Sequence, residues 1–335
     1  MGPSQTGTAA APSDLPARSK VGVYALLVAN LVSLTGNQIT MYALPWFVLE
    51  TTDSAIQTSL VAATQMVAFL IAAIAGGVVV DRFGPKWLSV VSDIVSGLSI
   101  LAIPLLIDTV GLHLWQILAL AFFGAVLDSP GNNARFNIVT DLLDATGMEP
   151  ERVYSAFSTA DGIARIGGPI LAGGLIAWLG AINALWFDAA TFAVSAVLIA
   201  VLVPATSRAA SAAKSFVGDI KDGWEYLRQR EILIHFFTLI VLVNMSAVPL
   251  AAVVIPKIAR DFYDSSRAGG VMLAADGVGV IFGGILFGMI GRRLTPWRSM
   301  FFALFLLSVS ALTLAGLLPI VVSVGALVVT GLGFG

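Results

Sequence analysis

The sequence is poor in charged residues and contains no cysteine. Only 11% of its 335 residues are charged, whereas 58% are hydrophobic, and the mean hydropathy is +0.93. A soluble domain carries about 25% charged residues, so this chain has too few to cover a globular surface. The absence of cysteine excludes disulfides and thiolate metal sites, and two histidines, His113 and His235, are too few for a histidine-built metal centre. The composition therefore predicts an all-α polytopic membrane protein, and the net charge of −2 gives no indication of nucleic-acid binding.

Ten apolar segments are long enough to cross a bilayer, which takes roughly 20 residues. They are 22–48, 56–80, 87–107, 113–133, 153–178, 182–203, 232–255, 267–290, 298–317 and 319–335. Residues 1–21 are small, polar and punctuated by proline, which predicts a disordered cytoplasmic tail. The polar stretch 204–231 predicts a cytoplasmic loop. It separates a six-helix bundle, 22–203, from a group of four helices, 232–335.

The distribution of basic residues predicts the orientation of the chain, because inner loops are enriched in lysine and arginine. If the N-terminus is inside, the inner side holds Arg18, Lys20, Arg82, Lys86, Arg135, Arg152, Arg208, Lys214, Lys221, Arg228, Arg230, Arg292, Arg293 and Arg298. The outer side then holds Lys257, Arg260 and Arg267, while Arg165 lies within a span. We therefore predict a multi-pass protein of the inner membrane with a cytoplasmic N-terminus.

The turn between the second and third segments carries charges of both signs. The pattern G-x-x-x-D-R-x-G-x-K is formed there by Gly77, Asp81, Arg82, Gly84 and Lys86. The alternative interpretation is an ordinary charged turn, but the pattern resembles the loop motif of the major facilitator superfamily of transporters, and the resemblance extends from Val23 to the end of the chain. It implies the major facilitator fold, with about 10 of 12 transmembrane helices present. It also implies a gating role for this loop, in which Asp81 holds the two halves together through an eleventh helix that this sequence lacks.

The fifth segment contains small residues along one face. Gly162, Pro169 and Gly173 are spaced by seven and four residues, which places them on the same side of a helix, and Gly168 precedes the proline. The G-P-x-x-x-G core resembles the helix 5 motif of antiporters in this superfamily, which implies that it seals the pathway against leak. The alternative is generic packing between glycine-rich helices.

Several charges fall inside predicted spans, where ionisable residues are costly and often functional. The candidates are Asp128, Asp161, Arg165 and Asp276. Asp161 and Arg165 are four residues apart with the acid first, which favours an intrahelical pair that is either functional or structural. We expect Asp188 to cap or pair near a membrane surface and Asp93 to brace the inner loop.

The first and seventh helices line the cavity in this superfamily, so the resemblance makes their amides cavity candidates. These are Asn30, Asn37, Gln38 and Asn244. Neutral amides in an apolar cavity suit a small lipophilic, weakly polar substrate. Hydrogen bonding between helices is the alternative role.

The resemblance implies a secondary active transporter that exports hydrophobic small molecules, drug or macrolide-like, by proton antiport and alternating access. The order of Asp128, Pro130, Gly131 and Arg135 is similar to the macrolide-efflux and multidrug branch. No G-x-x-x-x-G-K-[ST] pattern occurs, so we expect no ATP hydrolysis by this chain, and we expect a monomer in the lipid bilayer with no cofactor beyond the proton gradient.

Three alternatives remain open at this point. One is a siderophore or lysophospholipid carrier of the same fold. A membrane-embedded enzyme is disfavoured, because two isolated histidines provide no catalytic cluster. The third is an inactive remnant, because the last segment stops at Gly331–Gly335 without an exit loop. We expect the natural chain to continue for about 70 to 90 residues, enough for two more spans.

Overall fold

The computed structural model describes residues 15–204, 247–290 and 296–334, together with residues 225, 229, 230, 234 and 245. Within these ranges it describes the backbone but not the side chains of residues 15–19, 73–83, 108, 110, 144, 290, 296–300, 303 and 334. The described residues form helices and short turns with no strand, as the composition predicted.

Six long helices form the first half of the chain. They are α1 (Leu15–Thr52), α2 (Ala55–Phe83), α3 (Pro85–Val110), α4 (Leu114–Thr146), α5 (Pro150–Leu179) and α6 (Ala181–Leu202). The second half contains the π-helical turn η1 (Leu250–Val254) followed by α9 (Ile255–Asp261), α10 (Ser266–Ile290), α11 (Pro296–Ala315) and α12 (Ile320–Phe334). In the described residues, seven helices are long and apolar enough to cross a membrane, and two shorter apolar stretches follow at Leu304–Ala315 and Ile320–Gly333.

The apolar runs form helices because a helix satisfies its own backbone hydrogen bonds, which hydrocarbon cannot do. The turns between them are short. Gly84 has a φ of 74°, a left-handed conformation that favours glycine, and Pro85 after it starts α3 at the first helical position. Only one residue therefore separates α2 from α3.

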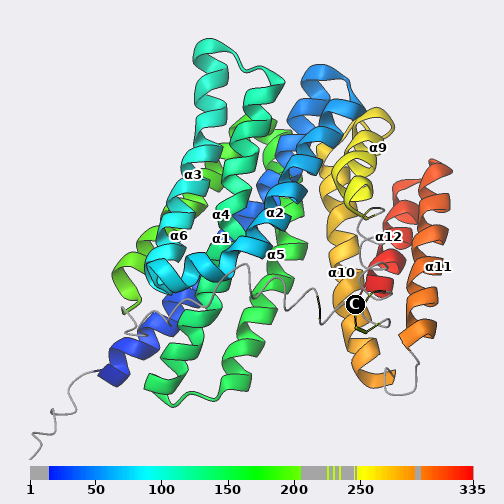
Figure 1. Ribbon diagram of the computed structural model, residues 1–335. Helices are drawn as coiled ribbons and strands as arrows, with labels where there is room; N and C mark the ends of the chain where they lie inside the picture. Colours follow the sequence, from blue (N-terminus) through cyan, green and yellow to red (C-terminus); the bar gives the residue numbers. More distant parts are fainter. Residues whose placement is uncertain are drawn as a thin grey trace, which may run out of the picture.

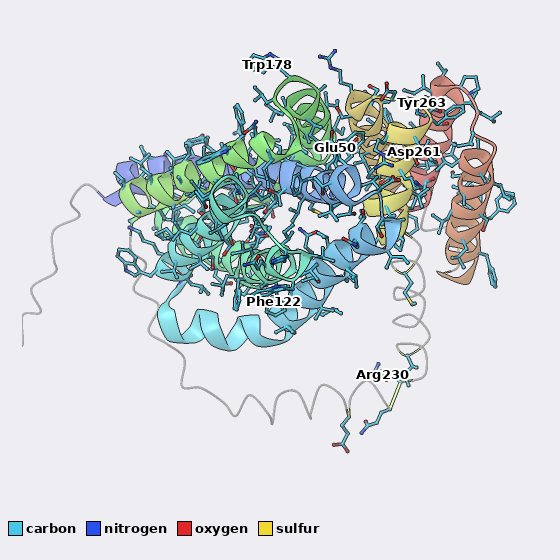
Figure 2. The ribbon with its side chains drawn as sticks, turned by 90° about the horizontal axis from the view of Figure 1, so that it is seen from above. Glu50, Phe122, Trp178, Arg230, Asp261 and Tyr263 are labelled. Carbon is cyan, nitrogen blue, oxygen red and sulfur yellow. The ribbon has the colours of Figure 1, made fainter. Side chains whose placement is uncertain are left out.

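The helices form two groups that meet along α5 and α10 (Figure 1). In the first group α1 packs along α5 and α6, and α3 packs against α4 and α6. In the second group α10 packs against α12, which also contacts α11. Many apolar side chains point outward, as Trp178 does at 77% exposure (Figure 2). An apolar exterior of this kind fits a protein surrounded by lipid.

Each end of the bundle is named here after a turn. The Asp53 end carries the turns at 53–54, 111–113, 180 and 262–265, and the Gly84 end carries the turns at 84 and 147–149. All five connections of the first half are short, so the helices run alternately from one end to the other.

Two boundaries differ from the sequence prediction. Helix α1 begins at Leu15, inside the segment predicted to be a tail. Helix α4 continues to Thr146, so residues 134–146, which were predicted to be loop, are helical. A span predicted from apolar residues stops where the first charged residue appears. The helix itself can continue past that point when the charged side chain is buried against a partner. Arg135, predicted to lie in the inner loop, is instead 1% exposed within α4.

Candidate functional site

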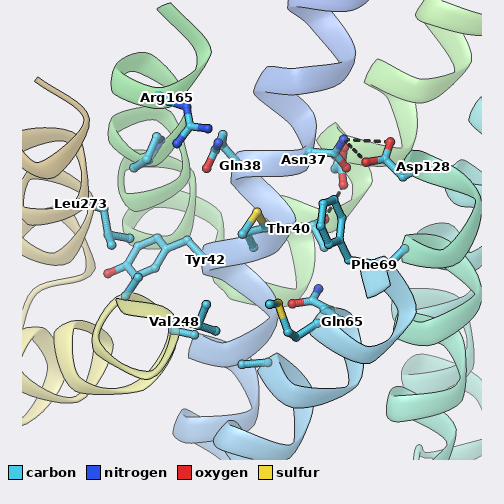
Figure 3. A pocket seen from close by; sticks show the side chains of 18 of the residues that line it. Asn37, Gln38, Thr40, Tyr42, Gln65, Phe69, Asp128, Arg165, Val248 and Leu273 are labelled. Atoms are coloured by element: carbon cyan, nitrogen blue, oxygen red, sulfur yellow. Dashed lines mark hydrogen bonds between the residues drawn. The ribbon is translucent and has the colours of Figure 1, made fainter. Parts of the chain in front are cut away.

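A cavity of about 760 Å³ lies where the two groups of helices meet (Figure 3). It is lined from one side by α1 to α6 and from the other by α10 and residues 247–252. Its apolar wall includes Met41, Met66, Phe69, Phe192 and Leu273. The volume is within the range of sites that hold small molecules, roughly 300–1,000 Å³.

The described lining residues include four carboxyl groups and one basic side chain. The carboxyl groups belong to Asp128, Asp161, Asp188 and Asp276, and the base is Arg165. Three of these acids, together with Arg165, were predicted candidates, and the structure brings them to one cavity. Asp188 was not a candidate.

Asp128 on α4 is held by amides. The side-chain amide of Asn37 on α1 donates to both Asp128 oxygens, at 3.0 and 3.1 Å (Figure 3). Asn132, one turn along α4, donates to Oδ2 at 3.3 Å. Asn37 therefore contributes to the cavity, as predicted, and it does so by orienting an acid. Gln38 also lines the cavity, and its side chain packs against Gly168 of α5.

Asp188 on α6, expected to cap or pair near a membrane surface, is fully buried inside the bundle. Thr40 of α1 donates a hydrogen bond to its Oδ2, and Thr191 donates to its Oδ1 at 3.1 Å. Gly36 of α1 lies directly against the same carboxyl group, where any Cβ would clash with Oδ1. The close packing of α1 on α6 thus removes this acid from solvent.

The predicted pair within α5 is confirmed. Arg165 Nε lies 3.1 Å from Asp161 Oδ2, and both side chains are about half exposed toward the cavity, at 52% and 49%. Asp276 on α10 is within electrostatic range of Arg165 across the interface. Arg165 therefore stands between an acid of its own helix and an acid of the other half.

A buried ion pair lies beside the cavity, toward the Gly84 end of the bundle. Arg135 Nη2 is 2.5 Å from Asp93 Oδ1, with the two side chains 1% and 2% exposed. Arg135 also donates to the side chains of Asn30, Ser33, Ser89, Asn132 and Ser195 at 3.2 to 3.3 Å.

Two expectations are corrected by this ion pair. Asn30, predicted to line the cavity, is 4% exposed and binds Arg135 instead. Asp93, expected to brace the inner loop, pairs with α4 and receives a hydrogen bond from Ser195 of α6 at 2.7 Å. The helix packing explains the contacts of both residues. Helix α4 packs against α1 and α3 in the interior of the first half, so Arg135 of α4 reaches Asn30 of α1 and Asp93 of α3.

The small residues of α5 allow close contact with α10. A Cβ at Gly173 would lie 2.7 Å from the carbonyl oxygen of Ser266 and 3.2 Å from Cα of Gly270. A Cβ at Gly270 would clash with the carbonyl oxygen of Pro169. Nearer the start of α5, Gly162 faces Ile281 of α10. A Cβ at Gly162 would lie 3.1 Å from Cδ1 of Ile281. The motif therefore packs α5 closely against α10, and its sealing role stays a prediction.

Polar contacts join the two groups of helices at the Asp53 end. Tyr42 of α1 donates to the carbonyl oxygen of Ser266 at 2.9 Å, and Ser266 Oγ donates to the carbonyl oxygen of Gly173 at 3.1 Å. Arg260 of α9 donates to the carbonyl oxygen of Leu49 at 2.5 Å and pairs with Asp53. These contacts tie α1 and α5 of the first half to α9 and α10 of the second.

The charges at this end perturb one another. Hydrogen bonds to Asp53 and Asp261 raise the pKa of Arg260 above its ordinary value. Hydrogen bonds from Lys257 and Arg260 lower the pKa of Asp261. Asp261 therefore stays ionised at neutral pH and holds the Arg260 guanidinium, with its Oδ1 2.7 Å from Arg260 Nε.

The predicted gating loop is described only in part. Gly84 forms the turn, and Lys86 Nζ donates to the carbonyl oxygen of Ala200 at 2.9 Å while lying 5.7 Å from the Trp87 ring centroid. The surroundings of Gly77, the side chains of Asp81 and Arg82, and all of Asn244 lie outside the described residues. Their predicted roles stay predictions.

Sequence reasoning missed the buried pair and Asp188. Asp128, Asn132 and Arg135 are spaced by four and three residues, so extending the helix beyond residue 133 would have placed them on one face. Asp188 is followed at three residues by Thr191, but nothing in the sequence pairs it with Thr40, 148 residues earlier. No group of three or more His, Cys, Asp or Glu suited to a metal occurs in the described residues.

Comparison with known proteins agrees with this architecture. The family model of the Major Facilitator Superfamily matches residues 26–335. The chain is 27% identical over 318 residues to the "Multidrug efflux pump Tap" of Mycobacterium tuberculosis, covering 93% of this chain and 76% of that protein. It is 24% identical over 306 residues to "Macrolide efflux protein A" of Streptococcus pyogenes, covering 90% of this chain and 74% of that protein. The crystal structure of the nucleoside transporter NupG superposes with a TM-score of 0.76 at 14% identity, over 93% of this chain and 79% of that one.

Proposed function

We propose that this chain, which belongs to the major facilitator superfamily, is a secondary transporter that exports hydrophobic small molecules, drug or macrolide-like, by proton antiport. The observation that carries the proposal is the cavity between the two halves, which combines an apolar wall with four carboxyl groups, one of them, that of Asp188, fully buried. An apolar wall gains free energy from a lipophilic substrate whatever its exact shape. Carboxyl groups in the same cavity can bind and release protons.

The printed names of the relatives support the same substrate class. The proteins matched over 90% or more of this chain are called a multidrug efflux pump and a macrolide efflux protein. The described lining residues include Phe69, Phe192 and two methionines, Met41 and Met66. Such side chains adapt to varied apolar ligands, because thioethers are flexible and aromatic rings offer broad contact surfaces.

Alternating access would require the contacts at the Asp53 end to open. By the distribution of basic residues we place the Asp53 end on the outer side of the inner membrane and the N-terminus in the cytoplasm. The transporter would then hold its cavity closed to the outside in the conformation described, through Tyr42, Ser266 and Arg260. We expect it to work as a monomer, since the cavity is formed within one chain.

Reporter fusions test this orientation. A reporter inserted within 208–228 should read cytoplasmic, and one inserted within 261–266 should read as external. The first range follows α6 and the second follows the end of α9. The predicted topology places these two ranges on opposite sides of the membrane. The reverse result at either position contradicts the orientation.

Transport in proteoliposomes tests the function itself. We expect ethidium and erythromycin to accumulate in vesicles that contain the purified protein when a proton gradient is imposed, and we expect no accumulation once a protonophore removes it. Substrate addition should in turn release protons, measured with a trapped pH dye. Net accumulation that requires no proton gradient would contradict antiport. Failure to move either compound, with transport of a lysophospholipid or ferric siderophore instead, would favour the other carrier class.

A further inference from the structure

The acids in and beside the cavity differ in the charges that face them. Asp161 pairs with Arg165, which is also within electrostatic range of Asp276. Asp93 pairs with Arg135, whose charge also acts on Asp128. Each of these four acids therefore has a cation nearby.

Asp188 differs, since the side chains bonded to it in the described structure are neutral hydroxyls. Thr40 from α1 and Thr191 from its own helix supply these hydrogen bonds. Two acids, Asp93 of α3 and Asp128 of α4, are within electrostatic range of it across the bundle, and Asp93 is itself paired with Arg135. An ionised Asp188 would thus gain two hydrogen bonds and two repulsions.

Burial makes the ionised form of Asp188 still less favourable. The side chain is 0% exposed, and α1 covers it with Gly36 and Thr40, which are four residues apart on one face. A buried carboxylate without a cationic partner is strongly disfavoured in a low-dielectric interior. The surroundings therefore favour a neutral, protonated carboxyl group in this conformation.

We propose that Asp188 is the residue that binds the transported proton. This rests on the proposed proton antiport and specifies which acid performs it. The proton bonds to a carboxylate oxygen from water on one side of the membrane and leaves to water on the other, with no other bond made or broken. The contact of Gly36 and Thr40 with Asp188 makes both steps depend on α1, because these residues cover the carboxyl group in this conformation.

Two modes of transport separate proton coupling from substrate binding. The first is ethidium accumulation driven by a proton gradient, and the second is exchange of ethidium across vesicles without a gradient. Asp188→Asn keeps the size and hydrogen bonding of the protonated acid but cannot release a proton. We expect it to lose at least tenfold in gradient-driven accumulation while it still exchanges ethidium. Asp188→Glu should retain coupling, and the matched control Glu151→Gln, an acid-to-amide change at an exposed position of α5, should retain both modes.

Infrared difference spectra between acid and alkaline pH give a readout that does not depend on transport. A buried protonated carboxyl group has a C=O stretch separated from the ionised form, and this band should disappear in Asp188→Asn and persist in Glu151→Gln. Thr40→Val should shift its frequency, because the carboxyl group loses one hydrogen bond.

The outcomes separate this assignment from the proposed function. If the unaltered protein moves no ethidium in either mode, the proposed function is contradicted. If it transports ethidium and Asp188→Asn still accumulates it at the full rate, only the assignment of the proton to Asp188 is overturned. If Asp188→Asn loses both modes but keeps the infrared band, the assignment is also overturned, because the band then belongs to another acid.

Discussion

Replacement of Arg135 by methionine tests how much the buried ion pair stabilises the first half of the protein. Arg135 is 1% exposed and lies 2.5 Å from Asp93, which is 2% exposed. Methionine fills part of the same volume but removes the positive charge. Asp93 would then remain ionised in the interior with Ser195 as its remaining donor, or it would have to take up a proton.

The expected loss is large because both partners are buried. Removing one member of a buried ion pair costs about 3–5 kcal/mol, since the other charge is left without a partner. The hydroxyl and amide groups of Ser33, Ser89 and Asn30 would also lose their link to the guanidinium. At about 2–4 °C per kcal/mol, this corresponds to a fall in Tm of roughly 6–20 °C.

The assay is thermal unfolding of the purified protein in detergent, with three variants compared. Arg135→Met alone should show the full fall in Tm. Arg135→Met combined with Asp93→Asn should recover much of it, because replacing both charges of a buried pair by neutral residues is often nearly neutral. The exposed Arg152→Met should stay within about 0.5 kcal/mol of the parent. A double variant that is as unstable as the sum of its single changes would refute the reasoning, since the charges would then not be coupled.

Two further changes concern contacts between the halves. Gly173→Val should disrupt the packing of α5 on α10 and lower both folded yield and transport, whereas Gly174→Val, with open space around its would-be Cβ, should do neither; equal effects would contradict the packing argument. Arg260→Ala should increase maleimide labelling from the Asp53 side of a single cysteine introduced at Leu273, which is unambiguous in a chain without cysteine. Acidification below about pH 4 should also weaken the contact of Asp261 with Arg260, which is present above the ordinary pKa of Asp261 and is lost as pH falls through its lowered pKa. Because maleimide needs the thiolate, this arm follows collisional quenching of a fluorophore attached to the same cysteine at pH 7. Unchanged quenching would show that this contact does not hold the end closed.

The sequence predicted the fold well because hydrophobic length is a local property. Each span of the first half is visible as an apolar run, and the turn at Gly84 is marked by a glycine followed by a proline. The intrahelical pair of Asp161 and Arg165 was also predictable, because both members lie on one helix at a fixed spacing. A helix positions such a pair without any help from tertiary structure.

Contacts between distant helices were not predictable in the same way. Asp93 meets Arg135 across 42 residues, and Thr40 meets Asp188 across 148. The rotation of each helix about its axis decides which polar side chain faces which neighbour, and an almost uniformly apolar helix gives little information about that rotation. Asn30 and Asn37 illustrate this, because they lie on the same face of α1, yet one binds the buried arginine and the other orients an acid in the cavity.

Helix α1 connects the acids of the cavity to the closed end of the bundle. Near its middle, Asn37 donates to Asp128 and Thr40 donates to Asp188. Beyond them, the carbonyl oxygen of Leu49 accepts a hydrogen bond from Arg260 of the other half. Pro45 lies between these two regions, inside the helix. A proline within a helix removes one backbone hydrogen bond and permits a bend at that point. A bend there would let the end of α1 follow the second half while its middle stays packed on α6, so opening of the Asp53 end would not expose Asp188 at once. Under the proposed antiport, proton release and opening of the Asp53 end would then be separate movements of one helix, as exchange without leak requires.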